Sequence, residues 1–233
     1  MSELLSIKGL WGGYKEGVDI LRGIDMTVQE GEAVGIIGLN GSGKSTLGKA
    51  IMNMIPFRRG EILFDGEGIM GLSTSELVRN GISIMQQGGK VFPNLSVWEN
   101  LELAFSSRMD SEFDRLRDII PILRSPKKEL QHRMADKLSG GQKHQLALAM
   151  TLATRPRLVI LDEPSAGLSP KAVEEMYGVI NELIMGRLTV LLIEQNVGKA
   201  VVFCDKCIVF RQGLVDKEIH NGNIANIESI YFK

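Results

Sequence analysis

The segment formed by residues 38–46 constrains the fold of this chain more than any other part of its sequence. It reads Gly-Leu-Asn-Gly-Ser-Gly-Lys-Ser-Thr and fits the pattern G-x-x-x-x-G-K-[ST], a loop that cradles nucleotide phosphates. Apolar residues 33–37 precede it in the manner of a short buried strand, and residues 45–54 follow it with the pattern of a helix. This order of strand, loop and helix predicts an α/β fold that binds a nucleoside triphosphate.

The residue types in this loop suit that chemistry. Gly38, Gly41 and Gly43 free the backbone to curl, so that successive N–H groups point into one concavity that holds an anion. Lys44 supplies an ammonium for the β- and γ-phosphates, and Ser45 supplies a hydroxyl for Mg²⁺. The predicted binding residues of the loop are Gly38, Leu39, Asn40, Gly41, Ser42, Gly43, Lys44, Ser45 and Thr46.

The composition is that of an ordinary globular protein without a strong charge. The chain has 233 residues and a formal net charge of −1, so it fits one large domain and offers no basic field for a nucleic-acid partner. The first residues lack the layout of a signal peptide, and the longest apolar runs fall far short of the roughly 18–20 residues that cross a bilayer. We therefore expect a cytoplasmic chain that reaches a membrane only through a partner.

The two cysteines, Cys204 and Cys207, form a single C-x-x-C pattern. One interpretation is a redox pair or half of a zinc site, but such a site needs further ligands, and His132, His144 and His220 show no ligand spacing. A redox pair usually opens a helix after a strand, whereas this pair straddles a predicted helix end and the next strand. We favour the other interpretation, two reduced and partly buried cysteines.

The remaining pattern predicts an α/β core that is interrupted by helices. Predicted strands cover residues 5–8, 24–28, 61–66, 82–85, 158–161, 189–193 and 208–210, and predicted helices cover residues 74–80 and 171–185. Near-continuous apolar strands that alternate with helices indicate a parallel sheet covered on both faces. Residues 96–153 are instead mostly helical in pattern, with Phe113, Leu116, Ile119 and Ile120 on one stripe.

Two acidic residues follow the predicted strand 158–161. Such a strand delivers Asp162 and Glu163 to the carboxyl edge of the sheet, where ligands bind in doubly wound folds. Asp162 can hold the Mg²⁺ shell, and Glu163 can orient or deprotonate an attacking water. The competing interpretation is an Asp-Glu pair that caps a turn before Pro164, and the presence of a phosphate loop disfavours it.

A second glycine-containing segment, residues 138–142, reads Leu-Ser-Gly-Gly-Gln before a long helical pattern. Ser139 is placed to cap this helix, and the two glycines leave the first N–H groups open to a phosphate. This would be a second anion site without a lysine, which one nucleotide on one compact chain does not need. A symmetric dimer explains it if each chain's second site faces the phosphate loop of the other; the alternative is an ordinary capped loop.

The phosphate loop and the acidic strand end, with the Leu-Ser-Gly-Gly-Gln segment between them in the sequence, resemble the ATP-binding cassette (ABC) ATPases, and the resemblance extends from about Ile7 to Gly213. It implies an α/β P-loop NTPase fold of ABC type, with a mixed or parallel sheet core, an antiparallel β subdomain and an inserted helical subdomain. Within this single ABC ATPase domain, residues 1–90 and 154–233 would form the core and about 91–153 the helical part. The family also implies a head-to-tail dimer that binds two ATP molecules with Mg²⁺. The implied contacts to the second chain's nucleotide are Ser139, Gly140, Gly141 and Gln142.

The resemblance supplies further site residues. Tyr14, thirty residues before Lys44, matches the aromatic residue that stacks on adenine, unless it is a tyrosine at a strand edge. Gln86 and Gln87 compete for the glutamine that meets Mg²⁺ and the attacking water. That glutamine commonly lies six residues before the proline of a segment such as residues 92–97, which favours Gln87.

Two positions depart from the family pattern. Gln195 stands where many members have a histidine that contacts the γ-phosphate, and glutamine can donate a hydrogen bond but cannot titrate near neutral pH. Ser169 replaces the usual aspartate in the turn 165–169, which is expected to cross the dimer interface. With Glu163 and Gln195 as catalytic residues, slow but real ATP hydrolysis is predicted. The predicted metal ligands are Ser45, Gln87 and Asp162.

Further segments resemble the paired ATPases of branched-chain amino acid importers. They are residues 92–100, 163–170, 194–196 and the terminal residues 230–233. The resemblance implies uptake of branched-chain or related amino acids, with urea or short amides as the alternative cargo. The implied partners are membrane permease subunits, a like or unlike second ATPase and, indirectly, a substrate-binding protein. The chain would then lie on the inner face of the cell membrane, held there by the permease.

A groove near residues 87–100 would transmit the motion of the dimer to the permease. Phe92, Leu95 and Trp98 are candidates for this groove, and each fits the core of the helical insert equally well. Two other functions remain as alternatives, a non-transport ABC ATPase and a phosphate-binding scaffold without catalysis. The first often carries two cassettes, a long insert or a basic extension, none of which this sequence contains. The intact set of predicted catalytic residues argues against the second.

Overall fold

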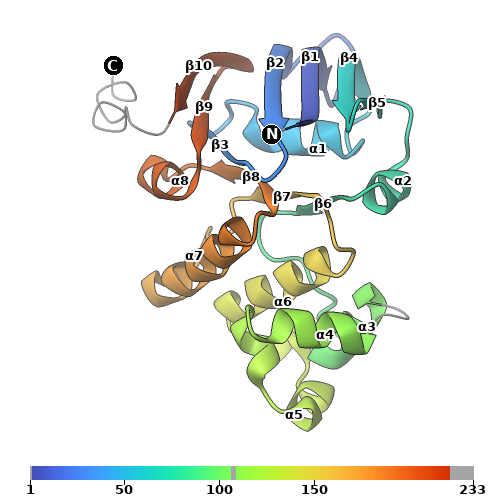
Figure 1. Ribbon diagram of the computed structural model, residues 1–233, viewed down its shortest axis with the longest axis vertical. Coiled ribbons are helices and arrows are strands. Elements are labelled where there is room, and N and C mark those ends of the chain that lie inside the picture. Colours follow the sequence, from blue (N-terminus) through green and yellow to red (C-terminus); the bar gives the residue numbers. More distant parts are fainter. Residues whose placement is uncertain (1, 106–108, 221–233) are drawn as a thin grey trace.

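The computed structural model describes residues 2–105 and 109–220, and its centre is a six-stranded sheet (Figure 1). The strand order is β10-β9-β3-β8-β7-β6, and all neighbours are parallel except β10, which pairs antiparallel with β9. The carboxyl ends of the parallel strands lie at one edge of the sheet, where ligands bind in such folds. The strands are β3 (Ala33–Gly38), β6 (Ile82–Met85), β7 (Leu158–Asp162), β8 (Thr189–Glu194), β9 (Lys206–Arg211) and β10 (Leu214–His220).

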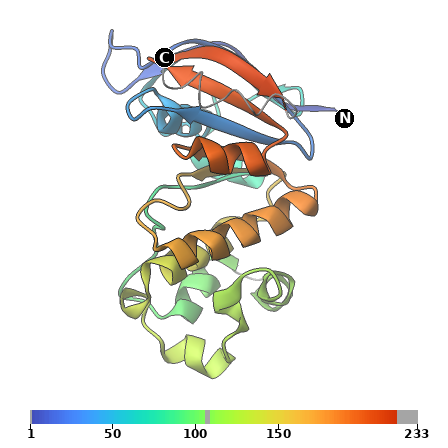
Figure 2. The same cartoon turned by 90° about the vertical axis from the view of Figure 1, so that its left-hand side faces the viewer.

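A second sheet, antiparallel and of strand order β2-β1-β4-β5, lies on the far side of helix α1 from the central sheet (Figures 1 and 2). Its strands are β1 (Glu3–Gly13), β2 (Leu21–Gln29), β4 (Phe57–Phe64) and β5 (Glu67–Gly68). The predicted ABC-type fold, with its mixed sheet core and antiparallel β subdomain, is therefore confirmed.

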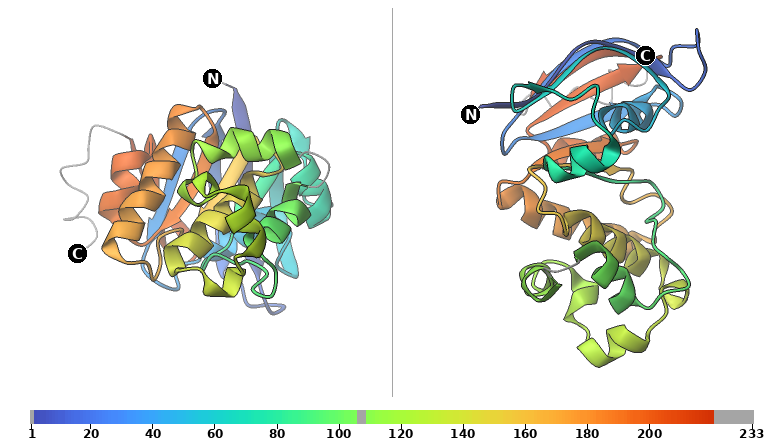
Figure 3. Two further views of the ribbon diagram at one scale, coloured as in Figure 1. Left: turned by 90° about the horizontal axis from the view of Figure 1, so that it is seen from below. Right: turned by 90° about the vertical axis from the view of Figure 1, so that its right-hand side faces the viewer.

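Helices α3 to α6 gather at one end of the molecule, away from both sheets, and α7 lies between them and the central sheet (Figures 1 and 3). None of the helices within residues 2–105 and 109–220 is long and apolar enough to cross a membrane. The helices are α1 (Lys44–Ile51), α2 (Thr74–Arg79), α3 (Val97–Phe105), α4 (Met109–Arg117), α5 (Lys127–His132), α6 (Gly140–Leu152), α7 (Pro170–Met185) and α8 (Val197–Phe203), with short 3-10 turns at Pro121–Arg124 and Ala135–Lys137.

The alternation of side chains along the central strands creates two hydrophobic cores. Val34 and Ile36 of β3 pack toward α1 and the antiparallel sheet, whereas Ala33 and Ile37 join the core that includes α7 and the helical end. Successive side chains of a strand point to opposite faces, so a continuous apolar strand is buried on both sides. This arrangement places the loop after β3 at the boundary between the two cores.

Helix α1 ends earlier than the sequence pattern predicts, at Ile51 rather than at residue 54. Asn53 adopts a φ of 54°, which is incompatible with a right-handed helix. Its side-chain amide donates a hydrogen bond of 2.8 Å to the carbonyl oxygen of Leu72, in the segment that leads to α2. A tertiary contact thus ends the helix where local sequence would extend it.

The apolar stripe predicted in the helical insert spans a helix and the turn after it. Helix α4 ends at Arg117, and Ile119 and Ile120 lie beyond it, because Pro121 disfavours a helical conformation in the residue before it. Ile120 is nevertheless fully buried. The pattern therefore predicted burial correctly and the helix boundary wrongly. The resemblance noted for residues 230–233 lies outside the described residues.

Candidate nucleotide-binding site

The loop between β3 and α1 needs its glycines both for space and for backbone conformation. A Cβ atom on Gly38 would lie 2.5 Å from the carbonyl oxygen of Phe210 and 2.6 Å from the Ser42 hydroxyl. Gly41 and Gly43 adopt φ values of 78° and 105°, in the left-handed region that favours glycine. Because Gly43 is the N-cap of α1, the open N–H groups of the first helical turn face the loop.

Lys44, the first residue of α1, folds back over the loop. Its Nζ atom donates hydrogen bonds to the carbonyl oxygens of Gly38 at 2.8 Å and Leu39 at 3.1 Å. Burial lowers the pKa of Lys44, and the carboxylates of Glu163 and Asp162 oppose that shift. The ammonium is thus held by two neutral oxygens, which a charged phosphate group can replace with stronger hydrogen bonds.

Ser45 and Asp162 form the next contact of the site. The Ser45 hydroxyl donates a hydrogen bond of 2.8 Å to Oδ1 of Asp162, the last residue of β7. Burial raises the pKa of Asp162; the hydrogen bond from Ser45 opposes this rise, and the neighbouring Glu163 adds to it. The fold therefore brings together two oxygen-bearing side chains that stand 117 positions apart in the sequence.

The carboxylate of Glu163 lies between two glutamine side chains. Gln87 donates from Nε2 to Oε2 at 2.6 Å, and Gln195 donates a short hydrogen bond from Nε2 to Oε1. Glu163 has a φ of 47°, a left-handed conformation that costs a non-glycine residue on the order of 1–3 kcal/mol. The surrounding structure thus holds the backbone of Glu163 in a conformation that a non-glycine residue disfavours.

One open cavity of about 480 Å³ is lined by Lys44, Ser45, Gln87, Glu163 and Gln195 of these groups, whereas Gly38 and Asp162, also predicted site residues, do not line it. Nine of the ten lining residues were predicted from the sequence, and they come from the segments that follow β3, β6, β7 and β8. The tenth, Ile20, precedes β2 and was not predicted. The lining residues are Ile20, Asn40, Gly41, Gly43, Lys44, Ser45, Thr46, Gln87, Glu163 and Gln195.

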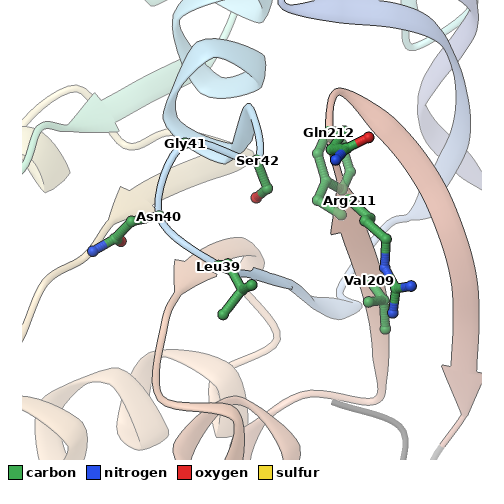
Figure 4. A pocket seen from close by; sticks show the side chains of 8 residues that line it. Leu39, Asn40, Gly41, Ser42, Val209, Arg211 and Gln212 are labelled. Atoms are coloured by element: carbon green, nitrogen blue, oxygen red, sulfur yellow. The ribbon is translucent and has the colours of Figure 1, made fainter. Parts of the chain in front are cut away.

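The outer side of the phosphate loop lines a second pocket, of about 450 Å³ (Figure 4). There Leu39 and Ser42 lie opposite Arg211 and Gln212, which come from the end of β9 and the turn after it. The Ser42 hydroxyl is buried and has no hydrogen-bond partner among the described residues. Leu39 and Ser42 therefore lie outside the 480 Å³ cavity, although both were predicted to bind nucleotide.

The second glycine-containing segment does not line that cavity, because it starts α6 in the helical end (Figure 1). Ser139 is the N-cap of α6, as predicted: its hydroxyl accepts from the Gln142 N–H at 3.3 Å, and the Gln142 side-chain oxygen accepts from the Ser139 N–H at 3.1 Å. Arg133 donates to the same oxygen at 2.8 Å. A Cβ on Gly141 would lie 2.8 Å from Cβ of Ala172, so this glycine allows α6 to approach α7 closely.

Tyr14, the predicted adenine-stacking residue, is not among the cavity's lining residues. It is half exposed and directly follows the end of β1. Lys49 of α1 lies over its ring, with Nζ 5.9 Å from the ring centroid. This position also fits the alternative interpretation of Tyr14 as a tyrosine at a strand edge.

A third pocket, of about 400 Å³, lies between the sheet core and the helical end. Phe92, which is 52% exposed, and Gln86 both line it, so Gln86 faces this groove while Gln87 contacts Glu163. Trp98 is only 6% exposed and packs against Phe113 at 5.4 Å between ring centroids. The assignment to a groove therefore fits Phe92 and is wrong for Trp98. Four methionines, Met52, Met54, Met85 and Met150, also line the groove.

The cysteine pair is placed as the sequence indicated. Cys204 follows α8 and Cys207 belongs to β9, and both are buried free thiols. Within the described ranges, no group of three or more His, Cys, Asp or Glu side chains could hold a metal ion.

One buried acidic residue beside the site had no predicted role. Glu194 ends β8, one residue before Gln195, and is 3% exposed. The only sequence signal was its place, a carboxylate at the carboxyl end of an apolar strand, as at the end of β7. Its carboxylate accepts four hydrogen bonds, from the hydroxyls of Tyr177 at 2.6 Å and Ser165 at 3.0 Å and from the N–H groups of Gln195 at 3.0 Å and Asn196 at 3.3 Å.

This geometry defines a P-loop nucleotide-hydrolysing protein: a glycine loop with its lysine, an acidic pair at the neighbouring strand end, and a separate capped glycine segment. The family model described as ABC transporter matches residues 21–166, more than half of the chain. The chain belongs to this family, and it is an ATPase.

Three relatives illustrate what the chain is similar to. It is 33% identical over 206 residues to the high-affinity branched-chain amino acid transport ATP-binding protein BraG of Pseudomonas aeruginosa, covering 87% of both chains. It is 36% identical over 208 residues to the probable branched-chain amino acid transport ATP-binding protein LivF of Archaeoglobus fulgidus, covering 87% of this chain and 86% of the other. It is 31% identical over 211 residues to the lipopolysaccharide export system ATP-binding protein LptB of Escherichia coli, covering 90% and 87%.

The comparison with solved structures agrees on the fold. The structure of cbiO1 from Clostridium perfringens, part of the ABC transporter complex cbiONQ, superposes with a TM-score of 0.84 at 26% identity. The match covers 99% of this chain and 93% of the other.

Proposed function

We propose that this chain is the ATP-hydrolysing subunit of a membrane importer whose cargo is a branched-chain or related amino acid. One observation carries the catalytic part: Glu163 accepts hydrogen bonds from Gln87 and Gln195 in the same cavity as Lys44 and Ser45. The similarity to BraG and LivF supports the cargo. The similarity to LptB supports a transport role but not this cargo.

The donor set of the site fits Mg²⁺. The Ser45 hydroxyl and the Asp162 carboxylate lie within 2.8 Å of each other, and Gln87 adds an amide group that reaches the adjacent Glu163. Hard oxygen donors completed by phosphate oxygens are what Mg²⁺ prefers, so we assign Ser45, Gln87 and Asp162 to its shell. When bound, the ion neutralises negative charge on the phosphate oxygens.

Glu163 acts in this proposal as the base for the attacking water. Each of its carboxylate oxygens accepts a hydrogen bond from one glutamine amide, and these two bonds orient the carboxylate. Gln195 holds the base from the side where many relatives have histidine. Because an amide does not titrate near neutral pH, the rate should show no ionisation at this position.

A second ATPase chain completes the site in this proposal. Ser139, Gly140, Gly141 and Gln142 would contact the nucleotide held by the phosphate loop of the other chain, which is why they lie outside the cavity of their own. Tyr14 would stack on adenine. Both a like and an unlike second chain satisfy this arrangement.

The groove beside Phe92 is the proposed contact with the permease. It is lined by residues between 52 and 90 and by Thr154 on the side of the proposed α/β core, and by residues between 92 and 151 on the side of the proposed helical part, so a helix seated there would respond to their relative motion. Its methionines are adaptable apolar side chains that suit such a contact. The chain would lie on the cytoplasmic face of the membrane through this partner.

The substitution Glu163→Gln tests the catalytic assignment. It keeps the size of the side chain but removes the base, so ATP turnover should fall roughly a hundredfold or more, while the affinity for ATP stays within about threefold. Phosphate release and nucleotide titration measure the two quantities, with Glu182→Gln on the exposed side of α7 as the matched control. Turnover that persists undiminished would show that Glu163 is not the base.

Transport assays test the cargo. The tagged chain is purified with its membrane partners, reconstituted in proteoliposomes with the binding protein, and supplied with leucine, valine, urea or a short amide. ATP turnover and uptake should rise with the branched-chain amino acids. A response to urea or to the amide alone would overturn the proposed amino acid cargo and leave the proposed ATPase role intact. Co-purification with lipid-export components would overturn the proposed role in an importer.

A further inference from the structure

The buried carboxylate of Glu194 closes a ring of contacts around the proposed catalytic residues. Starting from Glu163, the chain leads in two residues to Ser165, whose hydroxyl donates to Oε1 of Glu194 at 3.0 Å. Gln195, which directly follows Glu194 in the sequence, donates from its side chain to Oε1 of Glu163. Two short stretches of backbone and two hydrogen bonds therefore join the turn after β7 to the loop after β8.

The other oxygen of Glu194 fixes the start of the loop that carries Gln195. Oε2 accepts from the backbone N–H of Gln195 at 3.0 Å and of Asn196 at 3.3 Å. Asn196 is the N-cap of α8, and its side chain accepts from the Lys199 N–H. The backbone of this loop is thus held at both ends, by a carboxylate on one side and by a helix cap on the other.

Tyr177 anchors the ring to helix α7. Its hydroxyl donates to Oε1 of Glu194 at 2.6 Å, and its ring stacks on Phe203 of α8 at 5.0 Å between centroids. Burial and the Glu194 carboxylate raise the pKa of Tyr177, so its hydroxyl is protonated and donates near neutral pH. All four donors converge on a side chain that is 3% exposed, which leaves it no access to nucleotide or water.

We infer that Glu194 is a positioning residue for ATP hydrolysis: it holds Gln195, and through it Glu163, in the geometry that the reaction needs. The inference rests on the roles proposed above for Glu163 and Gln195. A shift of about 1 Å in a positioned group can reduce a rate roughly a hundredfold, and one carboxylate here restrains both loops. Glu194 acts by hydrogen bonds, and its charge is not required.

Two substitutions at this position separate positioning from charge. Glu194→Leu has a similar volume and no acceptor, so kcat should fall roughly ten- to a hundredfold while KM for ATP stays within about threefold. Glu194→Gln should keep kcat within about threefold of the parent, because its amide oxygen can accept from the two backbone N–H groups and its NH₂ group can donate to the two hydroxyls. A loss with Glu194→Gln as large as that with Glu194→Leu would overturn the inference.

Controls distinguish positioning from loss of stability. Glu112 is also a buried carboxylate, bonded to Arg115 and Arg155 away from the cavity, so Glu112→Leu should lower the melting temperature but leave kcat unchanged. Should Glu194→Leu fail to fold, Ser165→Ala opens the ring at a partly exposed hydroxyl and should lower kcat roughly three- to tenfold. An unchanged kcat in Ser165→Ala would then overturn the inference.

A double substitution separates this inference from the proposed function. Because part of the effect of Glu194 passes through Gln195, the two losses should not add: Glu194→Leu should lower kcat by a smaller factor in the Gln195→Ala background than in the parent. If Gln195→Ala lowers kcat and Glu194→Leu does not, only the positioning inference fails. If Gln195→Ala leaves kcat unchanged, the proposed role of Gln195 fails and the positioning inference fails with it.

Discussion

The two segments proposed to contact phosphate are built in opposite ways. The loop after β3 is held by contacts from distant parts of the sequence: Ser45 bonds Asp162, and Gly38 packs against Phe210. The segment that starts α6 is held by itself, through reciprocal hydrogen bonds between Ser139 and Gln142. The first segment buries Lys44 at the start of α1, whereas Ser139 and Gly140 at the start of α6 are exposed.

In the proposed dimer, this difference distinguishes the half of the site that one chain supplies from the half that depends on a partner. The loop after β3 faces a lysine, a hydroxyl and an acidic pair in its own chain, so a single chain can bind a triphosphate there. The α6 segment has its cap satisfied locally and has no lysine. A capped helix N-terminus attracts phosphate only modestly by itself, so under the proposal the segment contributes when another chain delivers the nucleotide.

The largest effect expected from this contrast is on binding to the single chain. Lys44→Ala removes the ammonium from the phosphate loop, and charge-assisted hydrogen bonds of about 3 kcal/mol correspond to a loss of affinity of roughly a hundredfold. Titration with a fluorescent ATP analogue measures it, with Lys8→Ala, an exposed lysine on β1, as the control. Unchanged affinity in Lys44→Ala would place the triphosphate elsewhere.

A smaller effect is expected from the α6 segment, and on turnover rather than on binding. Ser139→Ala should leave the affinity of the dilute chain for ATP unchanged and should lower ATP turnover roughly tenfold, because the hydroxyl is needed only when two chains meet. Each loss of a serine cap also costs about 1 kcal/mol of stability.

The chain offers a matched control for that loss. Ser73 heads α2 with the same reciprocal arrangement, here with Glu76, so Ser73→Ala should lower stability by a similar amount and leave turnover intact. Equal turnover in Ser73→Ala and Ser139→Ala would contradict the proposed role of the α6 segment.

The contrast between local and distant contacts also explains how much of the site could be predicted from the sequence. The phosphate loop and the acidic pair at the end of an apolar strand are short local patterns, and they could be placed at one sheet edge before any contact was known, whereas Gln87 was predicted only through the family resemblance. Ser139 was predictable as a cap because a cap depends on residues three positions away. Patterns of this kind are predictable because the contacts that they specify lie within a few residues of each other in the sequence.

What the sequence could not predict depends on distant contacts. Glu194 meets Ser165 and Tyr177, which stand 29 and 17 positions away, and only the fold reveals that they share its carboxylate. Trp98 fitted both a groove and a core because an apolar residue at helical spacing does not specify what it packs against. The left-handed conformation of Glu163 has no signal in the sequence at all.

The smallest expected effect is on the stability of the nucleotide-free chain, to which the buried Asp162 carboxylate is unfavourable. Burial raises the pKa of Asp162, so its ionised form destabilises the nucleotide-free chain near neutral pH. A raised pKa in the folded chain means that this group favours folding below its unfolded pKa and loses that contribution as pH rises through its folded value. Asp162→Asn, whose amide oxygen can still accept from Ser45, should therefore raise the melting temperature at pH 7.5 by a few degrees at most, and by less at pH 5.

Added Mg²⁺ and ATP should reverse the order of the melting temperatures of the parent and Asp162→Asn. The Asp162 carboxylate is then a proposed Mg²⁺ ligand rather than a buried charge held by Ser45. Thermal unfolding of both proteins with and without nucleotide measures this reversal. A variant that is less stable than the parent without ligand would show that the Asp162 carboxylate stabilises the empty site. The phosphate loop would then be stabilised by its own contacts without a ligand, as the α6 segment is.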